Sequence, residues 1–282
     1  MRLRRSSLLA FRRRVIRTTP FVAGATLGAM LIRERRARRN AERFAAAALE
    51  SLLRAIDAND PQTGAHVRRV ADYALILTDA LGVSEKDRRT IELAALFHDI
   101  GKIHEALFDI VHEPGKLTPS DRRAIATHPT RGAEVLAPLA SFHPELTDAV
   151  LSHHERWDGR GYPRQLRRNR IPLPARIVSI VDTFDAITHS RRYRNGRTAK
   201  KAAQIILRGR GTQFDPDLVD LMLLPPVFEQ IMEAHRRWST GGNKIPNRRE
   251  DRGRESAPNV RIRWRSRSEP PPRLRKELAE AR

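Results

Sequence analysis

Residues 84–102 read Ser84-Glu-Lys-Asp-Arg-Arg-Thr-Ile-Glu-Leu-Ala-Ala-Leu-Phe-His-Asp-Ile-Gly-Lys102, and this stretch decides the fold class. A helix is predicted to begin at Ser84, because a capping hydroxyl followed by acidic residues is typical of a helix start. Its apolar residues Leu93, Leu96 and Phe97 lead directly to His98-Asp99. Gly101 follows and indicates that the helix ends at this pair.

The neighbouring segments have the same helical character. Over residues 66–81, Val70, Tyr73, Leu77 and Leu81 form one stripe, and Gly82 then ends the segment. Further helices are expected over residues 44–56, 119–129, 131–139, 144–154, 174–190 and 198–207. Since no alternating strand pattern is present, the sequence predicts an all-α fold.

The basic charge of the chain is concentrated at its two ends. The formal net charge is +21, of which residues 1–43 carry +11 (13 Arg against two Glu) and residues 236–282 carry +9 (15 basic against six acidic). We therefore predict a basic N-terminal extension (1–43), a globular domain (44–236) and a disordered basic tail (237–282). The two basic ends are expected to contact an anionic membrane or nucleic acid.

Residues 20–32 form a short apolar run between two arginine-rich blocks. Three interpretations stay open: an amphipathic or disordered cytoplasmic extension, a membrane-contacting segment, and a cleaved signal peptide. The second basic block argues against the signal peptide, and no run approaches the roughly 18 apolar residues typical of a membrane span. We expect a cytoplasmic protein, with a peripheral position at the inner face of the membrane as the alternative.

The chain has no cysteine, which excludes a disulfide scaffold, a zinc ribbon, an iron–sulfur cluster and a thiol nucleophile. A metal must therefore bind to His, Asp or Glu. Candidate ligands are expected at helix ends, with gaps of 32, 29, 25 and 28 residues between successive groups: His66, His98, Asp99, His128, His153, His154 and Asp182. Each gap is one helix plus a connection, and a helical bundle can bring such side chains to one point. A lone histidine is more often a core residue, but adjacent pairs at helix ends are harder to explain in that way.

Two motifs carry a family resemblance. His98-Asp-Ile-Gly-Lys102 resembles the core of the HD metal-dependent phosphohydrolase superfamily, and His153-His-Glu-Arg-Trp-Asp-Gly-Arg-Gly-Tyr-Pro163 resembles the second signature of its HD-GYP branch. Asp60-Pro-Gln-Thr-Gly-Ala-His66 and Asp182-Thr-Phe-Asp-Ala-Ile-Thr188 also agree, and the likeness covers about residues 49–235. It implies an HD-type helical bundle with an added C-terminal helical portion. It also implies a bacterial enzyme that hydrolyses cyclic di-GMP on two or three metal ions.

The resemblance also assigns roles to individual residues. All seven candidate ligands match metal ligands of the family; Asp99 would bridge two ions, and Lys102 would lie beside the bridging hydroxide and the scissile phosphate. Arg191, Arg194 and Tyr162 would contact the substrate. Some family members use a glutamate where this chain has Gln62, so we expect two divalent ions rather than three. Histidine and carboxylate ligands favour iron or manganese, with zinc as an alternative.

The favoured hypothesis is a phosphodiesterase in which metal-bound hydroxide opens cyclic di-GMP to linear pGpG, with GMP as a further product. A second hypothesis is a weakly active cyclic di-GMP receptor that acts through its GYP loop on a protein partner, for example a diguanylate cyclase domain. A third keeps the HD phosphohydrolase and changes the substrate to another cyclic dinucleotide or nucleotide. The sequence leaves the oligomeric state open.

Overall fold

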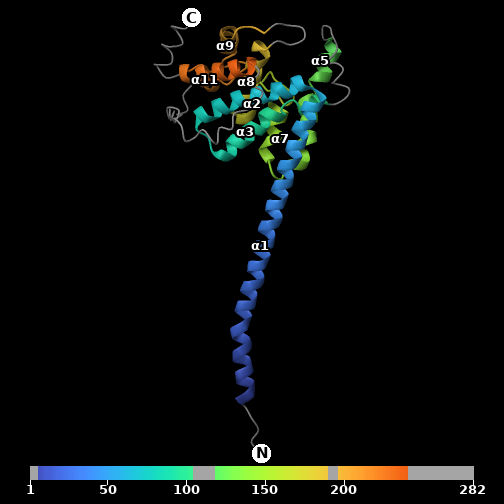
Figure 1. Ribbon diagram of the computed structural model, residues 1–282, viewed down its shortest axis with the longest axis vertical. Helices are drawn as coiled ribbons and strands as arrows, with labels where there is room; N and C mark the ends of the chain where they lie inside the picture. Colours follow the sequence, from blue (N-terminus) through green and yellow to red (C-terminus); the bar gives the residue numbers. More distant parts are fainter. Residues whose placement is uncertain (1–5, 104–117, 190–195, 241–282) are drawn as a thin grey trace, which may run out of the picture. The chain divides into compact units, whose positions relative to one another are not determined.

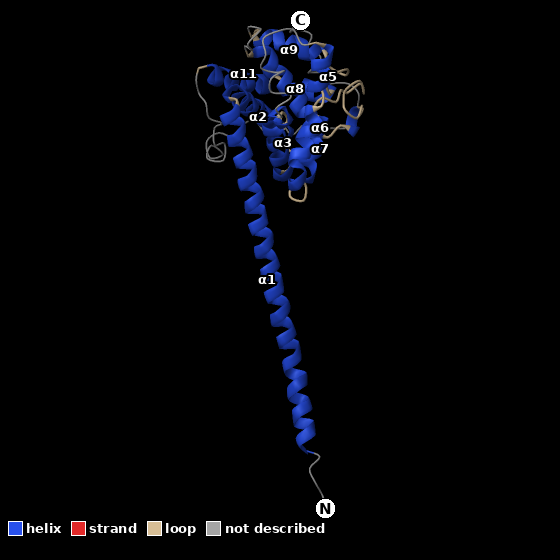
Figure 2. Cartoon of the chain, turned by 90° about the vertical axis from the view of Figure 1, so that its right-hand side faces the viewer, coloured by secondary structure: helices blue, strands red, loops and turns tan. Residues whose placement is uncertain are grey.

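The computed structural model describes residues 6–103, 118–189 and 196–240, with the side chains of most residues from 30 onward. Within these ranges the chain is helical and forms no strand, apart from one isolated bridge between Arg210 and Phe214 (Figure 2). The predicted all-α fold is therefore confirmed.

Most of the helices are labelled in Figure 1, and α6 is labelled in Figure 2. In chain order they are α1 (Ser6–Asn59), α2 (Pro61–Leu81), α3 (Glu85–Phe97), α5 (Pro119–Ile125), α6 (His128–Leu136), α7 (Pro144–Ser152), α8 (Leu173–Thr188), α9 (Ala199–Arg208), α10 (Pro216–Met222) and α11 (Pro225–Ser239). Short 3-10 turns are η1 (Ile100–Ile103), η2 (Ala137–Leu139) and η3 (Arg168–Arg170).

Helix α1 contains the whole described part of the basic N-terminal extension. The boundary that we predicted at residue 44 falls inside this helix. The chain divides into two compact units a few residues later, between Ser51 and Leu52. Arginine has a high helix propensity, which suits a helical conformation for this arginine-rich stretch. Among the residues that the structure describes, no helix has the length and apolar character needed to cross a bilayer.

The helix boundaries that the sequence predicted best are those with capping residues. The Ser84 hydroxyl accepts a hydrogen bond from the backbone N–H of Asp87 and caps α3. Gly82 ends α2 in the left-handed conformation with φ 65°. The start of α2 was predicted wrongly at residue 66, because Asp60 caps this helix and Pro61 begins it. Such capping residues satisfy backbone groups that a helix end leaves unpaired, which is why they mark helix ends in a sequence.

Helices α2, α3 and α8 pack against one another and form the centre of the domain. Each contributes a fully buried aromatic side chain, namely Tyr73, Phe97 and Phe184. Burial of one such ring contributes about 1.5–3 kcal/mol to folding. Turn η1 and helix α7 lie against α6, so candidate ligands stand both on these central helices and on the segments packed beside them.

Two predictions about helices were wrong. The helix that we expected to end near His128 stops at Ile125, and His128 begins α6 instead. Pro129 explains this start, because proline fits the first turn of a helix, where its missing N–H is not needed. Helices α10 and α11 were not predicted individually, although Val227, Ile231 and Ala234 give α11 a buried face at helical spacing. The predicted tail boundary at residue 237 falls within α11, and residues 241–282 lie outside the described part of the chain.

Candidate metal centre

The candidate ligands come from five different segments. His98 and His153 are the residues that end α3 and α7, and Asp99 and His154 follow them directly. The prediction that adjacent pairs stand at helix ends is thus confirmed. The single residues His66 and Asp182 were also expected at helix ends, and this was wrong, because they lie inside α2 and α8. These two meet because α2 and α8 pack against each other.

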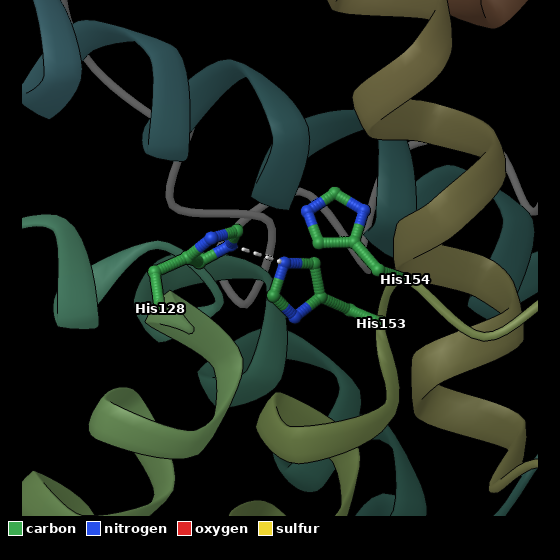
Figure 3. Close-up of side chains that lie close together, drawn as sticks. All are labelled: His128, His153 and His154. Atoms are coloured by element: carbon green, nitrogen blue, oxygen red, sulfur yellow. Dashed lines mark hydrogen bonds between the residues drawn. The ribbon is translucent and has the colours of Figure 1, made fainter. Parts of the chain in front are cut away.

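The first ligand group consists of His128, His153 and His154, whose ligand atoms all lie within 4.8 Å of one another (Figure 3). The Nδ1–H of His128 donates to the carbonyl of Ile125 at 2.7 Å, and that of His153 donates to the carbonyl of Val150 at 2.7 Å. Their Nε2 atoms therefore face each other as lone pairs, only 3.1 Å apart. Two acceptors at this distance require a cation or a proton between them.

Burial keeps His153 and His154 neutral. It lowers the pKa of His154 to about 3 and that of His153 well below its usual value, and the neighbouring histidines lower both further. A neutral imidazole is the form that binds a metal ion. His153 and His154 therefore offer lone pairs, rather than protons, to the space that the group shares.

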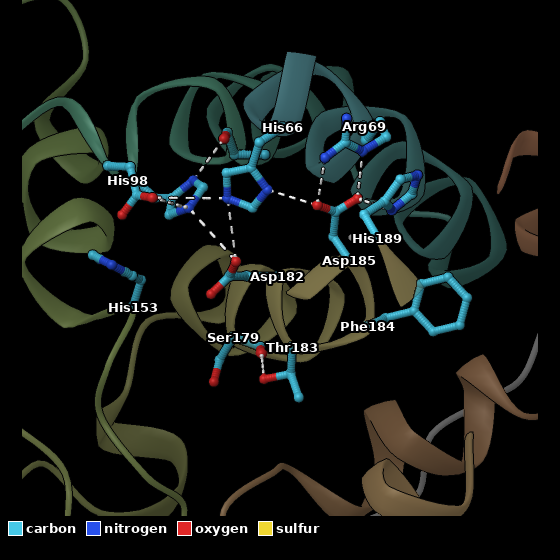
Figure 4. A network of polar contacts seen from close by, with 12 residues as sticks. His66, Arg69, His98, His153, Ser179, Asp182, Thr183, Phe184, Asp185 and His189 are labelled. Carbon is cyan, nitrogen blue, oxygen red and sulfur yellow. Dashed lines mark hydrogen bonds and ion pairs between the residues drawn. The ribbon is translucent and has the colours of Figure 1, made fainter. Parts of the chain in front are cut away.

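The second ligand group consists of His66, His98 and Asp182 (Figure 4). Oδ1 of Asp182 lies 3.3 Å from Nε2 of His66 and 4.0 Å from Nε2 of His98. The Nδ1–H of His98 donates to the carbonyl of Ala95 at 2.9 Å. Among the described residues, the buried Nε2 of His98 has no hydrogen-bond partner. A buried polar atom without a partner is costly, and a metal ion would satisfy it.

Asp99 lies between the two groups and turns one oxygen towards each. Its Oδ1 is 3.3 Å from Nε2 of His128, and its Oδ2 is 3.4 Å from Nε2 of His98 and 3.7 Å from Nε2 of His66. Lys102 donates to Oδ2 at 2.7 Å. This is the placement that a carboxylate bridging two ions needs.

The carboxylates of the centre are held in the ionised form. Burial by itself raises the pKa of Asp99, but Lys102 and His98 outweigh this effect and hold the pKa well below its usual range. Burial also raises the pKa of Asp182, but the hydrogen bond to His66 and the nearby histidines outweigh this effect and hold the pKa below its usual range. Burial lowers the pKa of His66, yet hydrogen bonds to Asp182 and Asp185 raise it to about 9. The carboxylates that hold a proton on His66 so firmly are equally suited to a divalent cation.

The remaining predicted site residues are distributed differently. The ring of Tyr162 stacks on that of His154, with centroids 4.9 Å apart and planes at 26°, so this residue does reach the centre. Gln62 is exposed in the first turn of α2 and belongs to neither ligand group. Arg191 and Arg194 lie outside the described residues.

Two buried carboxylates next to the ligands were missed. Glu155 follows the His153-His154 pair directly and accepts backbone hydrogen bonds from Arg164 at 2.6 Å and from Leu166 at 3.0 Å, so it fixes the loop that carries Tyr162. Asp185 lies one helical turn after Asp182 and accepts a hydrogen bond from Nδ1 of His66 at 2.7 Å. The sequence signal that could have identified Glu155 and Asp185 is their position beside predicted ligands, directly after His154 and one helical turn after Asp182.

The arrangement is suited to binding metal. One group of three histidines and one group of two histidines and an aspartate lie on either side of Asp99, and nitrogen and oxygen ligands of this kind are those that transition metals prefer. Two such ions close together can neutralise the charge that develops in a phosphoryl transfer.

Comparison with known proteins agrees with this chemistry. The model of the HD domain family matches residues 50–218. The cyclic di-GMP phosphodiesterase response regulator RpfG of Xanthomonas campestris pv. campestris (strain 8004) is 40% identical over 177 residues, which are 62% of this chain and 46% of that protein. The 3'3'-cGAMP-specific phosphodiesterase 2 of Vibrio cholerae is 35% identical over 175 residues, 61% of this chain and 33% of that protein. The chain thus spans less than half the length of either relative.

A solved structure shows a similar fold. The crystal structure of a cyclic GMP-AMP-specific phosphodiesterase of V. cholerae (V-cGAP3) aligns with a TM-score of 0.50 and 23% identity, covering 72% of this chain and 51% of that one. The likeness agrees with the helical architecture described above.

Proposed function

The chain belongs to the HD domain family, and from this membership we propose that it hydrolyses a phosphodiester bond of a cyclic dinucleotide. The observation that carries the proposal is Asp99, which turns one oxygen towards each of two buried ligand groups. The two relatives described above are named as phosphodiesterases of cyclic di-GMP and of 3'3'-cGAMP. We propose cyclic di-GMP as the substrate and linear pGpG as the main product.

We propose two ions per chain, iron or manganese by preference and zinc as the alternative, held by the seven ligands predicted from the sequence. When bound, such a pair of ions lowers the pKa of water and withdraws charge from phosphorus. The neutral side chain of Gln62 supplies no anionic ligand for a third ion, and its exposed position outside both groups supports the lower number.

The chain's own groups would then bind and orient the substrate. Lys102 brings an ammonium group to the centre through its hydrogen bond to Asp99, where it can hold a phosphodiester anion. Tyr162 places an aromatic ring against His154, and an aromatic ring at this position can stack on a guanine base. Arg191 and Arg194 remain proposed phosphate contacts.

Turnover by the full chain tests the proposal. Purified protein is analysed for iron, manganese and zinc and incubated with cyclic di-GMP, 3'3'-cGAMP and a linear dinucleotide. We expect pGpG from cyclic di-GMP, and Asp99→Ala should lose both the ions and the activity. A protein that binds metal and cyclic di-GMP without turnover would support the receptor hypothesis instead. Faster cleavage of 3'3'-cGAMP would replace the proposed substrate with that of the second relative.

A further inference from the structure

Asp185 is a buried carboxylate beside the centre, and both of its oxygens are used. Oδ2 accepts the hydrogen bond from Nδ1 of His66 at 2.7 Å, and Arg69 donates to the two oxygens at 2.7 and 2.9 Å (Figure 4). Nδ1 of His189 lies 3.0 Å from Oδ1. The Asp185 side chain is only 2% exposed, so these contacts replace water entirely. Of the seven proposed metal ligands, Asp185 contacts His66 alone.

His66 differs in this respect from three other histidines of the centre. His98, His128 and His153 each donate their Nδ1–H to the backbone carbonyl three residues earlier. Those carbonyls lie in the last turns of α3, α5 and α7, where carbonyl groups have no N–H partner within the helix. His66 stands inside α2, so its ring bonds to a carboxylate from another helix. A carboxylate partner makes an imidazole a stronger electron donor than a carbonyl partner does.

We propose that Asp185 is a positioning residue for the metal centre. It holds His66 with Nδ1–H turned away and Nε2 turned towards Asp99 and Asp182, and it makes His66 more electron-rich than His98, His128 or His153. The proposal rests on the metal centre proposed above and adds a residue that does not itself touch an ion. The bidentate contact of Arg69 fixes the orientation of the carboxylate plane, and the His189 contact ties the same carboxylate to the end of α8.

The test compares the same substitution at two buried carboxylates. Asp185→Asn keeps the size and one acceptor oxygen but removes the charge. Asp220→Asn is the matched control, because Asp220 is 2% exposed and pairs with both nitrogens of Arg210 at 2.7 Å, yet it contacts no candidate ligand. The full chain is stripped of metal and titrated with Mn²⁺ in competition with a chelator, and thermal unfolding of the stripped proteins is recorded alongside.

Asp185→Asn should weaken Mn²⁺ binding about 10- to 100-fold, the usual effect of losing a partner behind a metal-bound histidine. Asp220→Asn should lower the unfolding temperature and leave Mn²⁺ binding unchanged. Unchanged binding in Asp185→Asn, or equal weakening in both variants, would overturn the inference. If the wild-type chain itself binds no Mn²⁺, the proposed metal centre fails rather than this role of Asp185.

A measurement on the wild-type chain covers the case in which Asp185→Asn does not fold. Nitrogen-15 NMR of the histidine rings in the Zn²⁺-loaded protein distinguishes protonated from metal-bound ring nitrogens. We expect the proton of His66 on Nδ1 and the metal on Nε2. The reverse assignment would refute the positioning role, because Asp185 would then face a nitrogen that carries no proton.

Discussion

Replacing Gly101 with alanine should damage the metal centre through the backbone alone. A Cβ atom at this position would lie 2.1 Å from the carbonyl oxygen of His128 and 2.6 Å from the backbone nitrogen of Gly132. Ordinary contacts of this kind are about 3.5 Å, so η1 and α6 must separate by about 1 Å. Both obstructing atoms belong to the backbone of α6, which cannot turn aside as a side chain can. We expect a loss of about 1–3 kcal/mol in the free energy of unfolding.

The same shift should reach the ligands. The close approach joins Gly101 to the backbone of α6. Asp99 and Lys102 are close to Gly101 in the chain, and His128 begins α6. Metal–ligand distances are held to within about 0.2 Å, so a movement of this size should weaken Mn²⁺ binding by more than about tenfold. The assay is urea unfolding of the metal-free chain combined with Mn²⁺ titration.

Gly82→Ala is the control for Gly101→Ala. Gly82 has φ +65° and an added Cβ would meet nothing within 4 Å, so alanine there strains the end of α2 and should cost about 1 kcal/mol. It lies far along α2 from His66 and should leave Mn²⁺ binding intact. A folded Gly101→Ala protein that binds Mn²⁺ as tightly as wild type would refute the argument from the close approach.

Three further outcomes are expected. First, the pKa of His66 is raised from 6.5 to about 9, so its contribution to the stability of the metal-free chain is fully present below pH 6.5 and is lost as the pH rises through 9. Urea unfolding should show a decline on the order of 1–3 kcal/mol over this window, and the decline should vanish in His66→Gln. Second, Gln62→Glu should raise the metal content from about two towards three ions per chain in elemental analysis, and an unchanged content would count against our explanation of the lower number. Third, the full chain should bind anionic vesicles with a free energy that grows by about 1 kcal/mol per basic residue at the surface, and 1 M salt should release it. Retention until detergent is added would favour apolar insertion of residues 20–32.

The fold was predictable where the sequence carries local signals. Ser84 and Gly82 marked helix ends because each satisfies backbone groups at its own position. The pairs at residues 98–99 and 153–154 were recognised because adjacent polar residues are hard to explain as core residues of a helix. His66 and Asp182 were placed at helix ends wrongly, because spacing along the chain does not distinguish a helix end from an interior position that faces another helix.

The surroundings of the ligands were less predictable than the ligands themselves. Asp185 is 119 residues from His66 in the chain, and only the packing of α8 against α2 brings the two together. The closing helices α10 and α11 were missed although both have buried apolar residues; prolines stand at their first positions, Pro216 and the pair at 225–226, which is where a helix tolerates proline. Interactions of long sequence separation leave no local pattern from which to predict them.

The hydrogen bonds at Nδ1 have a consequence for the evolution of this domain. His98, His128 and His153 take their orientation from main-chain carbonyls, which are present whatever amino acid occupies the donor position. A point mutation at residues 95, 125 or 150 therefore leaves the acceptor in place. His66 has no such protection, because one base change in the codon of Asp185 can remove its partner. Sequence drift should thus be tolerated behind three of these ligands and purged behind the fourth.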